Sequence, residues 1–111
     1  MAKAKKFDSG KIRYDLVPAS ELEELARVYT MGAIKYGDKN YLKGGGLNEG
    51  RVYAAIIRHI QAQRMGKHID SESKLQALAH AAWGCFTLME YERLGFLGKQ
   101  KRKASKRWRK Q

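Results

Sequence analysis

Two clusters of acidic side chains have types and spacing suited to a divalent cation. Glu21 and Glu24 stand three residues apart, which places both carboxylates on one face of a helix within reach of one cation. Asp70 and Glu72 form the second cluster, in the sequence DSES. If the helices that carry the clusters pack side by side, four carboxylates meet at one end of a bundle and hold Mg²⁺, which takes oxygen ligands. Taken alone, each cluster is also explained as first-turn acids, which the helix dipole and capping favour.

Basic and imidazole side chains complete a set suited to phosphate chemistry. A triphosphate needs cations for the charges that a metal ion does not neutralise, although each basic residue is by default a surface charge. The candidates are Lys11, Arg13, Lys35, Arg51 and Arg58. His59 and His80 occur on apolar faces of two expected helices, where they either pack in the core or lie near one site. Acids, metal ion and cations together indicate hydrolysis of a phosphoanhydride by metal-activated water.

Length and charge bound the organisation of the chain. It has 111 residues, of which 43% are hydrophobic, and these values predict a single domain with an ordered core. The formal net charge of +12 favours polyanionic partners such as nucleotides, nucleic acid or acidic lipid. Eight of the basic residues and no acid fall between Gly98 and Gln111. We therefore expect a domain over residues 1–97 and a basic tail over residues 98–111. The tail is either solvated or binds nucleic acid, with Trp108 stacking among the basic residues.

Cysteine usage and hydropathy bear on the compartment. The single cysteine, Cys85, excludes an intramolecular disulfide, and its apolar neighbours predict a packed thiol. The basic residues at the start of the sequence are not followed by the apolar region of a secretory signal. No apolar run reaches the length of about 18 residues that spans a bilayer. We therefore expect a cytoplasmic protein without a membrane partner.

Local signals predict the first helix and the segment after it. Ser20 and Glu23 fit a capping box, and an apolar face at spacings of three and four residues continues to Gly37, which closes the helix. Gly32, within this helix, allows another backbone to come close. Residues 38–48 are rich in turn-forming types, so we expect a flexible loop there and no strand.

Two more helices follow from the same kind of signal. Asn48 caps the second helix, and Gly66 stands at its exit. Ser73 and Gln76 make another capping box, from which the third helix runs to about Leu94. Because no alternating strand pattern occurs, the sequence predicts an all-α bundle of three main helices.

The third helix is apolar almost all round between residues 75 and 89, which predicts a central position. Three helices of this length make a thin core, and the central helix has more apolar surface than two partners cover. We therefore expect a homo-oligomer, a dimer or tetramer, that completes the core.

Four segments, taken in order, resemble a known family. They are KFDSGKIRYDLVPASELEELARVYTMGAIKYGDKNY (residues 6–41), RHI (58–60), DSES (70–73) and LAHAAW (78–83). They resemble the small dATP/dGTP diphosphohydrolases of bacteriophages, which are related to the MazG-like all-α nucleotide pyrophosphohydrolases. The resemblance implies a helical homo-oligomer that uses Mg²⁺ or Mn²⁺. It also implies cleavage of purine deoxynucleoside triphosphates between the α- and β-phosphates, which gives a monophosphate and pyrophosphate.

The resemblance assigns roles to particular residues. The expected metal ligands are Glu21, Glu24, Asp70 and Glu72. The expected catalytic residues are Glu24, Lys35 and His80. The expected nucleotide-binding residues are Lys11, Arg13, Asn40, Tyr41 and Arg58. The segment before the first helix would lie over the nucleotide as a polar lid, with Lys11 and Arg13 on the phosphates. The amide of Asn40 would read a purine edge, and Tyr41 would stack on the base.

The chain also departs from the family pattern at three positions. Lys74, Ala77 and Gly84 stand where the resemblance implies other residue types, and those positions would serve the metal or the water. Two alternatives to the enzyme therefore stay open. One is a catalytically inactive protein of the same fold that binds or sequesters a nucleotide, and the other is nucleic-acid binding through the basic tail.

Overall fold

The computed structural model describes residues 3–7 and 9–98 of the chain, and this part is helical. Its elements are the 3₁₀ helix η1 (Tyr14–Leu16), α1 (Ala19–Tyr36), the 3₁₀ helix η2 (Asn40–Gly45), α2 (Glu49–Arg64) and α3 (Ala77–Leu94). Over these residues the only strand-like pairing is an isolated bridge between Ile69 and Gln76. The predicted all-α class with three main helices is therefore confirmed. Apart from Gly98, the expected basic tail with Trp108 lies outside the described residues.

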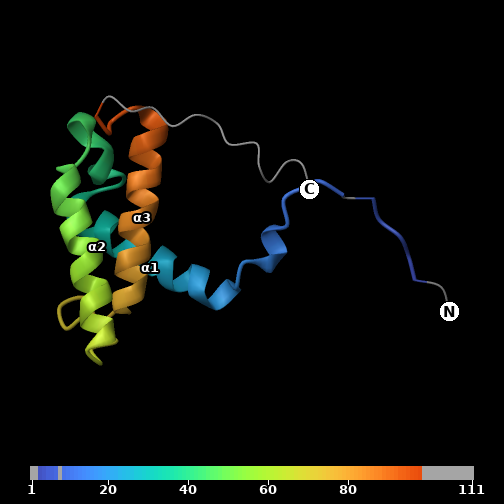
Figure 1. Ribbon diagram of the computed structural model, residues 1–111, viewed down its shortest axis with the longest axis horizontal. Helices are drawn as coiled ribbons and strands as arrows, with labels where there is room; N and C mark the ends of the chain where they lie inside the picture. Colours follow the sequence, from blue (N-terminus) through green and yellow to red (C-terminus); the bar gives the residue numbers. More distant parts are fainter. Residues whose placement is uncertain (1–2, 8, 99–111) are drawn as a thin grey trace.

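Helix α3 is the central element, as predicted. Helices α2 and α3 lie side by side in antiparallel directions, and α1 crosses behind them (Figure 1). Helix α3 contacts both of the other helices. The core is small, since the buried apolar residues of the described part are Leu25, Val28, Val52, Ile56, Ala77, Ala79, Ala81 and Tyr91. No helix among the described residues is both long and apolar enough to cross a membrane.

The α2–α3 contact depends on a glycine. Gly84 is buried in α3, and a Cβ atom added there would lie 2.3 Å from Cγ1 of Ile56 in α2. Any larger residue at this position would push the two helices apart. This contact gives a packing reason for Gly84, one of the three departures from the family pattern.

The capping box expected at the first helix does not form. Helix α1 begins at Ala19 with Pro18 as its N-cap, and no side chain caps it. The Ser20 hydroxyl instead donates a hydrogen bond to Oε1 of Glu21 at 2.8 Å. Because Pro18 disfavours helical conformation in the residue before it, the proline determines where the helix starts. The C-terminal prediction is confirmed, since Gly37 ends the helix with φ 98°.

The capping box expected at the third helix is also wrong, and α3 begins four residues later than Ser73. The carboxylate of Asp70 accepts from the Ser73 backbone N–H at 2.8 Å, which forms a turn in place of a helix end. Lys74 follows in the left-handed region with φ 65°, which a helix cannot contain. The Ser73 hydroxyl lies 2.6 Å from Nε2 of His80, so it contacts a side chain of α3 and does not cap the helix. In contrast, the cap predicted at Asn48 is confirmed, because its side chain accepts from the Arg51 N–H at 3.0 Å.

The segment between α1 and α2 is tied to α3, which the prediction of a flexible loop did not anticipate. The hydroxyl of the buried Tyr91 donates to the Tyr41 carbonyl and accepts from the Leu47 N–H. Gly46 packs against the same ring, where an added Cβ would lie 2.7 Å from Cζ of Tyr91. These contacts hold η2 in place beside α1 and α3.

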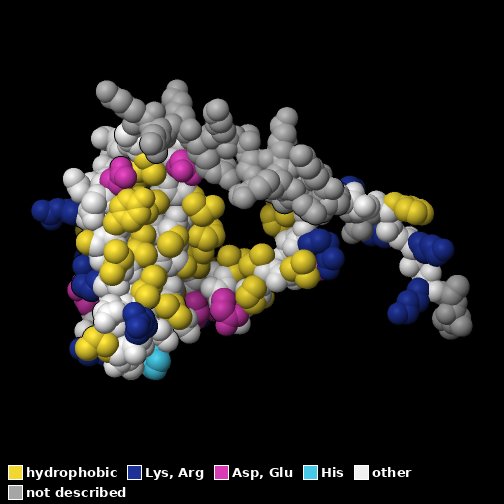
Figure 2. All heavy atoms as spheres, in the orientation of Figure 1, with side chains coloured by type: hydrophobic (Ala, Val, Ile, Leu, Met, Phe, Trp, Pro, Cys, Tyr) yellow, Lys and Arg dark blue, Asp and Glu magenta, His cyan; other side chains and the backbone are white. Residues whose placement is uncertain are grey.

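Much apolar surface stays exposed in the single chain. Figure 2 shows apolar side chains gathered over α2 and α3 on the face toward the viewer. The large apolar residues of these two helices that remain exposed are Tyr53, Ile57, Ile60, Leu78, Phe86, Met89 and Leu94. Cys85 is exposed as well, so the expected packed thiol is wrong in the single chain. Phe86 and Met89, which follow Cys85 in α3, are exposed with it.

Candidate functional site

A cavity of about 660 Å³ opens where α1, η2 and α3 meet. This volume is within the range of small-molecule sites, about 300 to 1,000 Å³. Residues 36–41 pass along it from the end of α1 into η2, and the other wall residues come from α1, α3 and Leu47. The lining residues are Val28, Tyr29, Met31, Gly32, Ala33, Tyr36, Gly37, Asp38, Lys39, Asn40, Tyr41, Leu47, His80 and Trp83.

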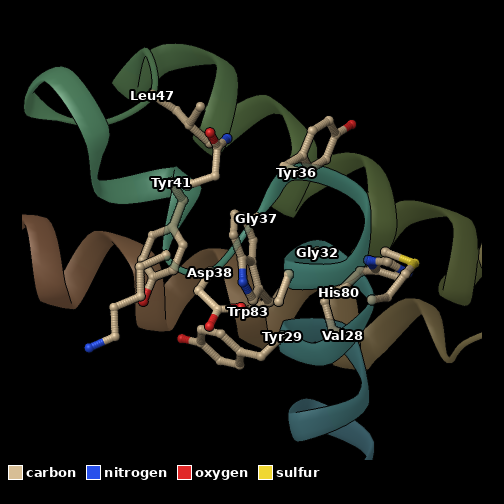
Figure 3. Close-up of a pocket in the computed structure, with 14 residues that line it drawn as sticks. Val28, Tyr29, Gly32, Tyr36, Gly37, Asp38, Tyr41, Leu47, His80 and Trp83 are labelled. Atoms are coloured by element: carbon tan, nitrogen blue, oxygen red, sulfur yellow. The ribbon is translucent and has the colours of Figure 1, made fainter.

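Three aromatic rings form one side of the cavity. Tyr29 of α1, Tyr41 of η2 and Trp83 of α3 contact one another with ring centroids 5.7 to 6.2 Å apart. Figure 3 shows these rings grouped together, with His80 on the opposite side. The rings meet at steep angles, 59° to 73°, so they present edges and faces of different orientation. Such a wall suits a flat heteroaromatic ligand, for which stacking and edge contacts are both favourable.

A carboxylate outside the wall holds Tyr41 in place. The Tyr41 hydroxyl donates to Oε1 of Glu90 at 2.7 Å, and Glu90 is further paired with Arg93 at 3.4 Å. Burial raises the pKa of Tyr41, and the hydrogen bond to Glu90 raises it further. Burial and the charge of Glu90 raise the pKa of Tyr29 in the same direction. Both phenols therefore stay neutral and act as hydrogen-bond and stacking groups rather than as bases.

Gly32 gives the cavity part of its space. An added Cβ at this position would meet no described atom within 4 Å. The expectation that Gly32 lets another backbone approach is therefore wrong in the single chain. A glycine in the interior of a helix is destabilising by about 0.5 to 1 kcal/mol relative to alanine. Here the missing side chain leaves the α1 wall of the cavity open.

The two histidines expected near one site are in contact. The rings of His59 in α2 and His80 in α3 stack with centroids 4.7 Å apart and an interplanar angle of 15°. Burial lowers the pKa of His59, and the neighbouring His80 lowers it further. His80 lines the aromatic cavity, whereas His59 lines a second, more polar cavity of about 620 Å³ together with His68 and Asp70. The histidine pair therefore lies between the two cavities.

The four expected metal ligands each have a different neighbour. Glu21 accepts from Ser20, Glu24 lies 3.3 Å from Arg27, and Glu72 lies 3.2 Å from Lys35. The backbone hydrogen bond from Ser73 lowers the pKa of Asp70. Among residues 3–7 and 9–98, no group of three or more His, Cys, Asp or Glu side chains could hold a metal ion. One chain therefore does not by itself form the expected four-carboxylate site.

Glu24 is nevertheless the best placed of the acids on α1. Its side chain is 29% exposed, against 64% for Glu23. It precedes Val28, a residue of the cavity wall, by one helical turn and therefore lies on the same face of α1. At the other end of this helix, Lys35 lies over the ring of Tyr36, 5.2 Å from its centroid. The pKa of Lys35 is raised, chiefly by its hydrogen bond to Glu72.

The structure brings some of the expected nucleotide-binding residues to the cavity and leaves others away from it. Asn40 and Tyr41 are in the wall, whereas Lys11, Arg13 and Arg58 are exposed and do not line it. Arg13 forms two hydrogen bonds of 2.8 Å with Asp15. The segment before α1 extends away from the α2–α3 pair (Figure 1). A lid formed by this segment over the nucleotide stays a prediction.

Of the wall residues, the sequence predicted Asn40, Tyr41 and His80 as site residues, and Tyr29, Asp38 and Trp83 are among those it missed. A signal existed for the aromatic ones. Tyr29 precedes Gly32 and Tyr36 at helical spacings, and Trp83 follows His80 by three residues, so each shares a helix face with a cavity residue. Asp38 stands in a turn, where no periodic pattern points to a site.

Comparison with known proteins identifies relatives. A family model described as dATP/dGTP diphosphohydrolase, N-terminal, matches residues 1–102. A curated protein of Salmonella phage PMBT28, named dATP/dGTP diphosphohydrolase, is 38% identical over 79 residues. The aligned region covers 71% of this chain and 26% of the phage protein, so the chain spans about a quarter of the length of that relative. No solved structure gives a significant match.

Proposed function

Because this chain belongs to the dATP/dGTP diphosphohydrolase N-terminal family, we propose that it hydrolyses dATP and dGTP to the monophosphate and pyrophosphate. The observation that carries the proposal is the aromatic cavity, because its rings and volume suit a purine nucleoside. The family description and the name of the phage relative give the substrate class.

In this proposal the purine and deoxyribose occupy the aromatic cavity. Tyr41, Tyr29 and Trp83 contact the base, and the Asn40 amide hydrogen-bonds to its edge. The triphosphate then extends past His80, the cavity residue that contacts the turn carrying Asp70 and Ser73. Lys35, the basic residue in the last turn of α1, offsets charge that develops on the phosphates.

Magnesium dependence is part of the proposal and rests on residue type and spacing. Mg²⁺ or Mn²⁺ would supply charge neutralisation and an activated water, and the ligand candidates are Glu21, Glu24, Asp70 and Glu72. The arrangement of these residues in one described chain does not fit a metal ion. His80 can hold or release a proton at Nε2, where Ser73 Oγ is its present neighbour at 2.6 Å.

The proposal also includes a homo-oligomer. Exposed apolar side chains of α2 and α3, among them Phe86 and Met89, would pack against a second copy. A partner chain could also bring its own N-terminal segment, with Lys11 and Arg13, toward this cavity. In the single chain that segment extends away from α2 and α3 (Figure 1).

Incubation of the protein with dATP and dGTP, with Mg²⁺, with Mn²⁺ and with EDTA, tests the proposal. Separation of nucleotides by anion exchange should show monophosphate and an equal amount of pyrophosphate only with the metal. Glu24→Gln should abolish this release while leaving the thermal transition in place. Binding of dGTP without its hydrolysis would show that the chain is the catalytically inactive nucleotide-binding protein and not the enzyme. Absence of both binding and turnover would reject the function.

A further inference from the structure

We propose that Asp38 reads the Watson–Crick edge of guanine and so distinguishes dGTP from other nucleotides in the aromatic cavity. The inference rests on the proposed function and deepens it, because it assigns base selection to one carboxylate. Asp38 lines the cavity directly after Gly37, at the point where the chain leaves α1. In Figure 3 its side chain lies on the side of the cavity where Tyr29, Tyr41 and Trp83 are grouped.

The carboxylate of Asp38 is free to accept hydrogen bonds from a ligand. Among the described residues, neither Asp38 nor Glu49 is engaged in a hydrogen bond or ion pair with another described side chain. Glu49 begins α2 and does not line the cavity. Asp38 is therefore the unengaged acid at the cavity, and its oxygens lose only water contacts when a ligand binds.

The backbone around Asp38 is held in a strained turn. The Asn40 N–H donates to the Gly37 carbonyl at 3.2 Å, which closes the turn. Lys39, between Asp38 and Asn40, has φ 54° and ψ 29°, in the left-handed region that costs a side-chain-bearing residue about 1 kcal/mol. Strain of this kind persists where the surrounding structure imposes it, and it is enriched at ligand sites. The consequence here is that Asp38 and Asn40 both reach the cavity wall from one short turn.

The chemistry of a carboxylate selects among the bases. An ionised carboxylate only accepts hydrogen bonds, and it has two oxygens that can accept in parallel. Guanine presents two adjacent donors, N1–H and the 2-amino group. Adenine places the N1 lone pair beside its 6-amino group, and neither thymine nor cytosine has two adjacent donors on this edge. Guanine is thus the base that can form two parallel bonds with Asp38, while the Asn40 amide can donate and accept and therefore suits adenine.

The pairing between guanine and Asp38 is tested by two changes. One removes a hydrogen-bond donor from the nucleotide, and the other removes the charge from the protein. The measurement is kcat/KM for dGTP, for deoxyinosine triphosphate, which lacks the 2-amino group, and for dATP. It is made on the wild-type chain, on Asp38→Asn and on Glu49→Gln as the charge-matched control. The wild type should prefer dGTP to deoxyinosine triphosphate by roughly tenfold or more. Asp38→Asn should lower kcat/KM for dGTP by roughly 10- to 100-fold and bring dGTP and deoxyinosine triphosphate within about threefold of each other. It should raise kcat/KM for dATP, because an amide can both donate to and accept from the adenine edge.

The outcomes separate the inference from the function on which it rests. An Asp38→Asn variant that keeps the wild-type preference for dGTP would overturn the inference while the enzyme stands. If the wild type hydrolyses none of the three triphosphates, the proposed function fails. Calorimetric binding of dGMP and deoxyinosine monophosphate to the same three proteins then decides the inference on its own. Asp38→Ser also removes the charge and should likewise lose the preference for dGTP over deoxyinosine triphosphate. It keeps the test decisive if Asp38→Asn fails to fold.

Discussion

His59 is the residue whose environment makes the clearest prediction about pH. Burial lowers its pKa, His80 and Arg58 lower it further, and Asp70 opposes them. The folded chain therefore disfavours the charged form, whereas the unfolded chain takes up the proton near the ordinary value of about 6.5. The free energy of unfolding should be fully retained above that pH and should decrease as the pH falls below it, until the lowered pKa is passed.

Urea unfolding between about pH 7.5 and about pH 5 measures this effect. His59→Gln should flatten the decrease, because the variant has no group to protonate at this position. His68→Gln is the control, since His68 is exposed and in a loop. A decrease of the same size in His59→Gln as in the wild type would show that the stacked pair does not cause it.

At the scale of residues, the sequence supports some predictions well because their causes are local. Asn48 caps its helix through a contact three residues away, so its type and position suffice. Ser73 has the same cap-forming character, but Asp70 and His80 take up its backbone and side chain, and these competing contacts are invisible in a capping pattern. The resemblance placed Asn40, Tyr41 and His80 at a nucleotide site, and all three line the cavity.

At the scale of elements, replacing each of two glycines inside helices by alanine should have opposite effects on stability. Gly84→Ala should destabilise the chain by about 1 to 3 kcal/mol, because the new Cβ would overlap Ile56 at the α2–α3 contact. Gly32→Ala should stabilise it by about 0.5 to 1 kcal/mol, because alanine favours the helix and the position is open. Denaturant midpoints of the two variants check both signs.

The Gly84 prediction has a further control in its neighbour. Ile56→Ala removes the atoms that the new Cβ would meet, so the double variant should be less destabilised than the sum of the two single changes. Strict additivity would mean that the Gly84–Ile56 contact is not the cause of the destabilisation.

The arrangement of elements also explains what the sequence could not predict about the site. Helical periodicity predicts which face of α1 or α3 is apolar, but it does not predict that α1 crosses behind α3 so that Tyr29 and Trp83 meet. The spacing of Glu21 and Glu24 is a local feature of α1, and their role as ligands of one cation stays a prediction. Whether other acids join them depends on tertiary and quaternary contacts, and the single chain does not bring them together.

At the scale of the whole molecule, the small core and the exposed apolar helix faces predict self-association. Light scattering after size exclusion should give a mass two or four times the 12.7 kDa of one chain. Met89 of α3 is 63% exposed, so Met89→Glu should shift the equilibrium toward a single chain by placing a charge in the contact. Thr30→Glu, which makes the same change of charge at an exposed position of α1, is the control. A wild-type mass of 12.7 kDa at micromolar concentration would contradict the prediction.

The central claim is that the aromatic cavity binds the nucleoside of a triphosphate that the chain hydrolyses. The most direct measurement is the kcat/KM for pyrophosphate release from dGTP by Gly32→Leu, compared with Gly32→Ala and the wild type. The leucine side chain extends into the open space at Gly32 and should lower kcat/KM by roughly tenfold or more with the thermal transition retained, whereas alanine should leave it within about threefold. A folded Gly32→Leu chain that hydrolyses dGTP as the wild type does would contradict the account.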